Sequence, residues 1–146
     1  MPAIKEFPTE SYIREPEKPF DPSDVLIQLD QMTSFYDVPG EFGHYLEGRD
    51  YGFSALTLII TETYPGGGPA LHSHECEEAH VLVEGTVSYV IGDRRFIATA
   101  PYVVKIPAGV PHSFLNIGTQ PIRMVGIFPE DHYTGTILGP HPLIKA

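Results

Sequence analysis

Three of the chain's seven histidines fall within nine residues, in the segment HSHECEEAH at positions 72–80. Alternate residues of an extended strand share a face, so we expect His72 and His74 to project in the same direction. Two imidazoles spaced in this way can bind one metal ion from a single rigid element. A further histidine, His112, follows a turn-forming run rich in proline and glycine and begins another predicted strand. Three imidazole nitrogens and a carboxylate such as that of Glu78 suit Fe, Mn, Co, Ni, Cu or Zn better than Ca or Mg.

Two segments of the chain resemble the two sequence motifs of the cupin superfamily. The first reads Gly66-(five)-His72-Ser-His74-(three)-Glu78-(six)-Gly85 and matches its motif at every defining position. The second reads Pro107-Ala-Gly109-(two)-His112-(three)-Asn116, and Pro101 stands where the usual opening glycine of this motif would be. The motif pair covers residues 66–116, about a third of the chain.

The resemblance implies an all-β fold, a cupin-type antiparallel β-barrel also described as a double-stranded β-helix or jelly roll, with a metal inside it. Carried over residue by residue, it implies that His72, His74, Glu78 and His112 are the metal ligands. One such residue alone would more often be a hydrogen-bonded core histidine or a solvated glutamate, but four at this spacing favour a metal site. The expected cofactor is one divalent transition metal per chain, with Fe or Mn favoured over Ni, Zn, Co and Cu.

Members of this superfamily catalyse several reaction classes, and fold analogy alone does not choose among them. We favour a metal-dependent dioxygenase-type oxidoreductase that acts on a small aromatic, diketone-like or hydroxy-acid substrate chelated to the metal, with O₂ as a candidate co-substrate. The alternatives are a redox-neutral isomerase, decarboxylase or lyase that uses the metal as a Lewis acid, and a non-catalytic cupin that binds a small molecule.

His80 is the residue of most interest outside the ligand set. It lies two residues beyond Glu78, so strand alternation points it into the same cavity, where it could act as a general base or orient the substrate. The alternative is a residue that merely lines the cavity. Cys76 shares the parity of its neighbours, but the family pattern places it in a bend, which argues against a ligand role. Glu75 and Glu77 are expected to form a solvated rim.

From Phe53 onward the chain has the pattern of an antiparallel β protein. Residues 53–63 are dense in the β-branched and apolar side chains that suit a pleated, half-buried surface. Further short runs of this kind, separated by glycine and proline, occupy residues 71–74, 78–84, 86–91, 94–99, 102–106, 111–117 and 122–128. This regular spacing of short runs, without an amphipathic helix between them, predicts a sandwich or barrel.

The ends of the chain have a different character. Five prolines between positions 2 and 22 exclude a helix in residues 1–24, which we interpret as an extended arm that packs on the body or on a partner subunit. Residues 25–146 would form a single cupin β-barrel domain. Within it, 25–32 is a candidate first strand, 35–48 resembles a loop, and the residues from Pro129 onward resemble a terminal arm with loop character.

Several apolar residues of the predicted strands should fill their two faces, and some must line the cavity. They are Leu56, Leu58, Val81, Leu82, Val83, Phe114, Met124 and Phe128. A mostly apolar cavity favours an aromatic or short aliphatic substrate over a sugar, whose hydroxyl groups would each need a partner. His44, His132 and His141 fall in predicted loops and are interpreted as surface residues.

Composition excludes several classes of partner. Nine Lys and Arg against nineteen Asp and Glu give a net charge of −10, so a nucleic-acid surface or an anionic-membrane patch is not expected. The first residues lack the apolar run of a signal peptide, and the longest apolar stretch is far shorter than the ~20 residues needed to span a bilayer. With one cysteine, this pattern fits a cytoplasmic protein. We expect a homodimer, the usual state of small cupins.

Overall fold

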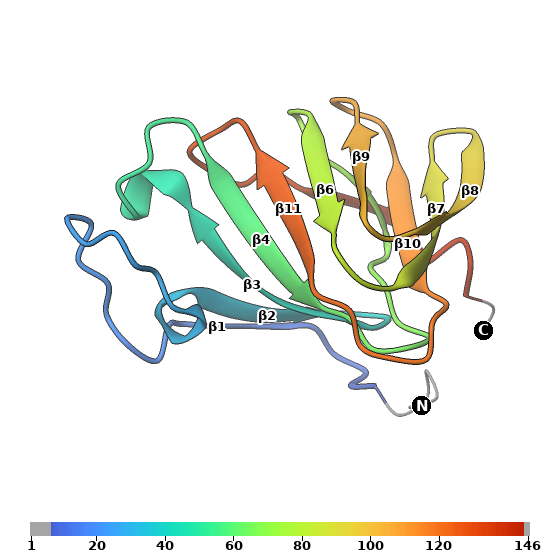
Figure 1. The fold of residues 1–146 in the computed structure, drawn as a ribbon, viewed down its shortest axis with the longest axis horizontal. Coiled ribbons are helices and arrows are strands. Elements are labelled where there is room, and N and C mark those ends of the chain that lie inside the picture. The colour runs from blue at the N-terminus through green and yellow to red at the C-terminus, as the bar shows by residue number, and fades with distance from the viewer. Residues whose placement is uncertain (1–6, 145–146) are drawn as a thin grey trace.

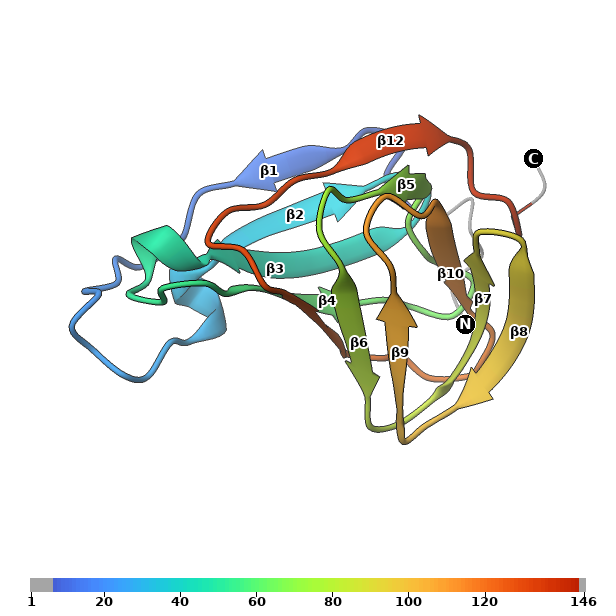
Figure 2. The same cartoon turned by 90° about the horizontal axis from the view of Figure 1, so that it is seen from above.

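In the computed structural model, which describes residues 7–144, the chain folds into two antiparallel β-sheets that face each other (Figures 1 and 2). The seven-stranded sheet has the order β1 (Tyr12–Arg14), β2 (Thr33–Asp37), β3 (Glu41–Glu47), β4 (Thr57–Glu62), β11 (Met124–Phe128), β6 (Glu78–Leu82) and β9 (Tyr102–Ile106). The five-stranded sheet has the order β12 (Thr136–Gly139), β5 (Leu71–Ser73), β10 (His112–Asn116), β7 (Thr86–Ile91) and β8 (Arg94–Thr99). The all-β jelly roll predicted from the sequence is confirmed.

Helical structure in the described residues is confined to two short 3₁₀ turns, Leu29–Gln31 and Gly48–Asp50. Neither is long and apolar enough to cross a membrane.

The core lies between the sheets and is built by strand alternation. In β6, Glu78, His80 and Leu82 are buried while the residues between them are partly exposed, so one face of this strand carries two polar side chains inward. The apolar cluster around Leu82 consists of Leu82, Val87, Tyr89, Ile91, Val104, Ile106, Phe114, Ile122 and Met124. Val83, expected to pack on a strand face, is instead 70% exposed, because β6 ends at Leu82 and Val83 belongs to the following turn.

Two predictions for the first third of the chain are wrong. Residues 25–32 form no strand: Val25 and Leu26 are exposed, and the run ends in the 3₁₀ turn Leu29–Gln31. Residues 35–48, interpreted as a loop, instead contain most of the β2–β3 hairpin. Its aromatic residues are cross-strand partners: Tyr36 lies opposite Phe42, with ring centroids 4.5 Å apart.

The terminal segments also contribute to the sheets. Within the predicted arm, β1 pairs with β2 of the same chain. The C-terminal segment contains β12, which pairs with β5, so the loop expected there is only partly correct. His141 is buried rather than on the surface, and its Nε2 atom lies 2.7 Å from the Phe114 carbonyl oxygen. His44 lies in β3 and is half-buried, not in a loop.

Candidate metal centre

Residues from both sheets meet at one point between the layers. His72 lies in β5, His74 follows directly after this strand, and His112 begins β10, where it pairs with His72 in the strand register. Glu78 begins β6 in the other sheet. The four residues that the sequence motifs single out are therefore brought together by three different strands and the segment after β5.

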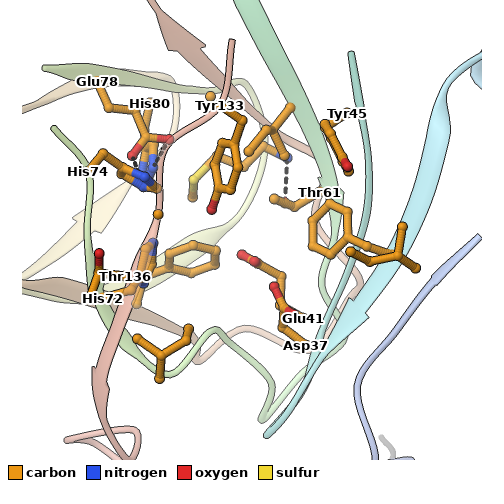
Figure 3. A pocket seen from close by; sticks show the side chains of 18 residues that line it. Asp37, Glu41, Tyr45, Thr61, His72, His74, Glu78, His80, Tyr133 and Thr136 are labelled. Atoms are coloured by element: carbon orange, nitrogen blue, oxygen red, sulfur yellow. Dashed lines mark hydrogen bonds and ion pairs between the residues drawn. The ribbon is translucent and has the colours of Figure 1, made fainter. Parts of the chain in front are cut away.

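The three imidazoles form a compact cluster. One ring nitrogen from each of His72, His74 and His112 lies within 4.8 Å of the others, a separation suited to one shared ion. Glu78 adjoins this cluster: its Oε1 atom lies 3.5 Å from Nε2 of His74 and 3.3 Å from Nε2 of His112. Figure 3 shows the Glu78 carboxyl group directed toward the His74 ring.

Each imidazole of the cluster is oriented by a backbone carbonyl. Nδ1 of His72 faces the oxygen of Ala70 at 2.7 Å, and Nδ1 of His112 faces that of Val110 at 2.9 Å. Nδ1 of His74 makes the same contact with the oxygen of Thr134. A carbonyl can only accept a hydrogen bond, so each Nδ1 carries a proton, and in the neutral imidazole the Nε2 atom then presents its lone pair. This is the arrangement in which backbone partners fix a metal-binding histidine.

The charge states of these groups suit a cation. Burial lowers the pKa of His72 to about 3 and also lowers the pKa of His74, so both imidazoles are neutral near pH 7. Burial alone would raise the pKa of Glu78, but His80 and the other nearby imidazoles outweigh it and hold that pKa below its ordinary value. His72 and His74 thus provide neutral nitrogen donors beside an ionised carboxylate.

Two atoms of the centre lack hydrogen-bond partners, and they show whether the residues of the centre suit a metal ion. Among the described residues, Glu78 Oε1 and His112 Nε2 are buried without a hydrogen-bond partner. With the proton of His112 on Nδ1, these two atoms turn lone pairs toward each other across 3.3 Å. Buried polar atoms left in this way are costly unless a further group satisfies them. A divalent cation accepts both lone pairs, so the residues fit a metal ion.

A second layer of contacts holds the Glu78 carboxylate. Nε2 of His80 lies 3.1 Å from Oε2 of Glu78, and because a carboxylate only accepts, this nitrogen donates. Nδ1 of His80 lies 3.2 Å from the Tyr89 hydroxyl, which is 3.0 Å from the hydroxyl of Tyr102. His80 therefore lines the cavity, as alternation predicts, with both ring nitrogens engaged. A Cβ atom on Gly126 of β11 would approach Glu78 Oε2 to 2.6 Å, so the carboxylate needs a glycine there.

The centre opens into a pocket of about 240 Å³ between the sheets (Figure 3). Most of its wall is apolar, and no Lys or Arg is among the described residues that line it. The lining residues are Ile13, Phe35, Asp37, Glu41, Tyr45, Ile59, Thr61, His72, His74, Glu78, His80, Phe114, Met124, Gly126, Tyr133, Gly135, Thr136 and Ile137.

Sequence reasoning missed part of this wall. Asp37, Glu41 and Tyr45 come from the β2–β3 hairpin, whose strands were not predicted, and their acidic and aromatic character was the available signal. Tyr133 packs its ring against His74 with centroids 5.4 Å apart. Cys76 is half-buried and lies outside the histidine cluster.

Glu75 and Glu77 are exposed, as expected for a rim.

The fold and the centre together define a class: a jelly roll with a buried, metal-capable histidine cluster at its middle. The family model described as "Cupin domain" matches residues 59–128, which include all three histidines of the cluster and Glu78. This part of the chain is therefore a cupin domain.

Two known proteins of Escherichia coli are similar to most of the chain. The chain is 30% identical over 118 residues to the HTH-type transcriptional regulator PuuR of Escherichia coli strain K12, covering 78% of this chain and 60% of that protein. It is 25% identical over 114 residues to mannose-1-phosphate guanylyltransferase 2 of Escherichia coli O157:H7, covering 73% and 23% respectively.

A solved structure of oxalate decarboxylase from Bacillus subtilis, an enzyme with Mn(II) centres, superposes with a TM-score of 0.64 at 23% identity. The match covers 68% of this chain and 28% of that chain and concerns the fold. The chain thus spans less than two thirds of the length of each of these relatives.

Proposed function

We propose that this protein is a metal-dependent cupin enzyme of the dioxygenase type, acting on a small, mainly apolar substrate that chelates the metal through two oxygen atoms. The observation that carries the proposal is the pair of unpartnered lone-pair atoms, Glu78 Oε1 and His112 Nε2, facing each other beside His74. His72, His74, Glu78 and His112 would hold the ion. One divalent transition metal, with Fe or Mn favoured, would supply Lewis acidity and electron transfer to O₂.

The pocket supports this class of substrate by its size and its charge. About 240 Å³ accommodates a single substituted ring or a short diketone, and the walls offer mostly carbon atoms. Without Lys or Arg among the described lining residues, a small dianion would meet carboxylates and no cation apart from the metal. Apolar walls also favour O₂, an apolar molecule, over water.

Within this proposal Glu78 and His80 are the residues closest to the chemistry. Glu78 would bind the ion with one carboxylate oxygen, while His80 holds the other through the 3.1 Å contact. His80 is thus in position to keep the carboxylate oriented and to exchange a proton with it or with a substrate in the pocket.

A redox-neutral reaction is the second candidate, and the contact chain behind His80 is the observation that favours it. The hydroxyl groups of Tyr89 and Tyr102 continue from Nδ1 of His80 away from the metal centre. Such a chain can deliver or remove a proton, as an isomerase, decarboxylase or lyase requires.

Turnover with and without O₂ separates these candidates. The protein is purified without chelator, its metal is quantified, and catechols, diketones, flavonols and hydroxy acids are incubated aerobically and anaerobically. The proposal predicts stoichiometric O₂ uptake that is lost in His112→Gln and retained in His44→Gln, a histidine of β3 outside the pocket. Substrate conversion without O₂ uptake supports the redox-neutral candidate. Metal binding with no conversion contradicts both and leaves a binding role, as in a regulator.

We also propose a cytoplasmic homodimer. Ile13 on β1 and Ile137 and Leu138 on β12 are exposed apolar residues on terminal strands, which supports pairing with a second copy. Light scattering at micromolar concentration tests it, and a monomer would contradict it.

A further inference from the structure

Two carboxyl groups lie in the pocket at the end of the β2–β3 hairpin. Asp37 ends β2 and Glu41 begins β3, and the two residues are direct partners in the strand register. Figure 3 shows their side chains next to each other on the pocket wall, apart from the histidines and Glu78. Side chains paired in this way have Cβ atoms about 4.5–5.5 Å apart, so one ligand group can contact both carboxyl groups.

Neither carboxyl group is neutralised by the protein. Glu41 is only 8% exposed and Asp37 is half-buried, yet neither makes a hydrogen bond or ion pair through its carboxyl group with the described residues. Burial, followed by the charges of Asp37 and Glu78, raises the pKa of Glu41 well above its ordinary value, and burial also raises the pKa of Asp37. A buried acid without a partner lowers stability, so its presence in a pocket wall points to a ligand that supplies the missing partner.

We propose that the Asp37–Glu41 pair binds the hydrogen-bond-donating end of the substrate, an ammonium group in preference to a hydroxyl, and excludes a second carboxylate. This inference rests on the proposed function, in which the opposite end of the substrate carries the chelating oxygens. The substrate class becomes specific: two adjacent oxygens, a short apolar middle, and a donor group at the far end.

The walls between the two ends fit this description. Phe35 of β2 and Ile59 and Thr61 of β4 line the pocket. Tyr133 and Thr136, which Figure 3 labels, line it as well. An ammonium group at the pair would form charge-assisted hydrogen bonds in a low-dielectric wall, which are about twice as strong as neutral ones. A carboxylate there would face two acids without a compensating cation among the described lining residues.

Four catechols that differ at one position test the proposal. They are 3,4-dihydroxybenzylamine, 3,4-dihydroxybenzyl alcohol, 4-methylcatechol and 3,4-dihydroxybenzoate. Calorimetry is carried out without O₂ on the Zn²⁺-loaded protein, so that binding is measured without turnover. We expect the amine to bind about tenfold or more tightly than 4-methylcatechol, the alcohol to lie between them, and the carboxylate to bind most weakly.

Isosteric variants test whether the preference for the amine comes from Asp37 and Glu41. Asp37→Asn and Glu41→Gln should each reduce the advantage of the amine severalfold and weaken discrimination against the carboxylate. Glu84→Gln removes the same charge from an exposed position and should retain the wild-type order. Equal affinity for the amine and the carboxylate in the wild type, or a preference unchanged in both pocket variants, overturns the proposal.

A metal-free comparison keeps this inference separate from the proposed function. Benzylamine and benzoate share the apolar ring and lack chelating oxygens, and their binding to metal-free protein can be followed by NMR. If no catechol binds the Zn²⁺-loaded protein, chelation is contradicted, and these two probes still decide the role of the pair. Benzylamine binding that is lost in Glu41→Gln supports it; benzoate binding as tightly as benzylamine overturns it.

Discussion

At the residue scale, the centre depends on how Glu78 is held as much as on the histidines. One of its carboxylate oxygens faces His74 and His112, and the other is fixed by His80. The space for this carboxylate exists because position 126 carries no side chain. Outer contacts of this kind usually change metal affinity by about 10–100-fold when they are altered.

Gly126→Ala should therefore weaken metal binding by about 10–100-fold without unfolding the protein. The added methyl group would lie 2.6 Å from Glu78 Oε2 and displace the carboxylate. Gly139→Ala is the matched control, since a Cβ there meets no atom within 4 Å. Competition with a chelator of known affinity measures both variants. Equal affinity in Gly126→Ala and wild type would show that the carboxylate does not contribute.

Glu41 makes a second prediction at this scale, concerning stability and pH. Its pKa is raised in the folded protein by burial and by Asp37 and Glu78, so the native state binds more protons than the unfolded state. The free energy of unfolding then falls as pH rises from the ordinary carboxyl pKa through the raised one. The other titratable groups of the surrounding wall are His72, His74, His80, Tyr45 and Tyr133.

Glu41→Gln should lose less stability than wild type between pH 5 and pH 8, because it removes this buried charge. Urea unfolding at the two pH values, on metal-free samples of both proteins, measures the difference. Glu84→Gln, at an exposed position, should keep the wild-type pH dependence. A parallel pH dependence in Glu41→Gln and wild type would show that Glu41 is not a source of the effect.

At the scale of elements, the sequence predicted the strands whose apolar alternation is strong and local. The runs 86–91, 94–99 and 102–106 coincide with β7, β8 and β9. His72, His74 and Glu78 were recognised from motif spacing, because the connection between β5 and β6 is short and fixes that spacing. His112, which begins β10, was recognised from the second motif. Asp37 and Glu41 could not be assigned to the pocket, since their position depends on the pairing of β3 with β4.

The hairpin that carries these acids is stabilised by a buried aromatic contact. Tyr36 is fully buried, packs on Phe42 and Tyr12, and donates a hydrogen bond from its hydroxyl to the Pro8 carbonyl oxygen at 2.8 Å. Tyr36→Ala should cost about 3–5 kcal/mol of unfolding free energy, whereas Tyr36→Phe should cost about 1 kcal/mol. Chemical denaturation measures both. Equal losses in the two variants would place the stabilisation in the hydrogen bond instead of the ring.

At the scale of the whole molecule, a strongly acidic chain surrounds a centre whose residues suit a cation. The net charge of −10 includes three carboxyl groups of the pocket wall, those of Asp37, Glu41 and Glu78. Glu78 contacts the imidazoles of the centre, whereas Asp37 and Glu41 pair with each other on the pocket wall. A bound metal ion would reduce the negative potential of the pocket and accept the unpartnered lone pairs of the centre. Because His72 and His112 belong to one sheet and Glu78 to the other, the ion would also link the two sheets.

Anomalous diffraction from crystals of the protein loaded with Mn²⁺ shows directly whether the histidine cluster and Glu78 hold a metal ion. We expect one strong anomalous peak per chain, bounded by Nε2 of His72, His74 and His112 and by a carboxylate oxygen of Glu78, and we expect its loss in His112→Gln. No peak at this position, or a peak that persists unchanged in His112→Gln, would show that these residues do not form the metal site.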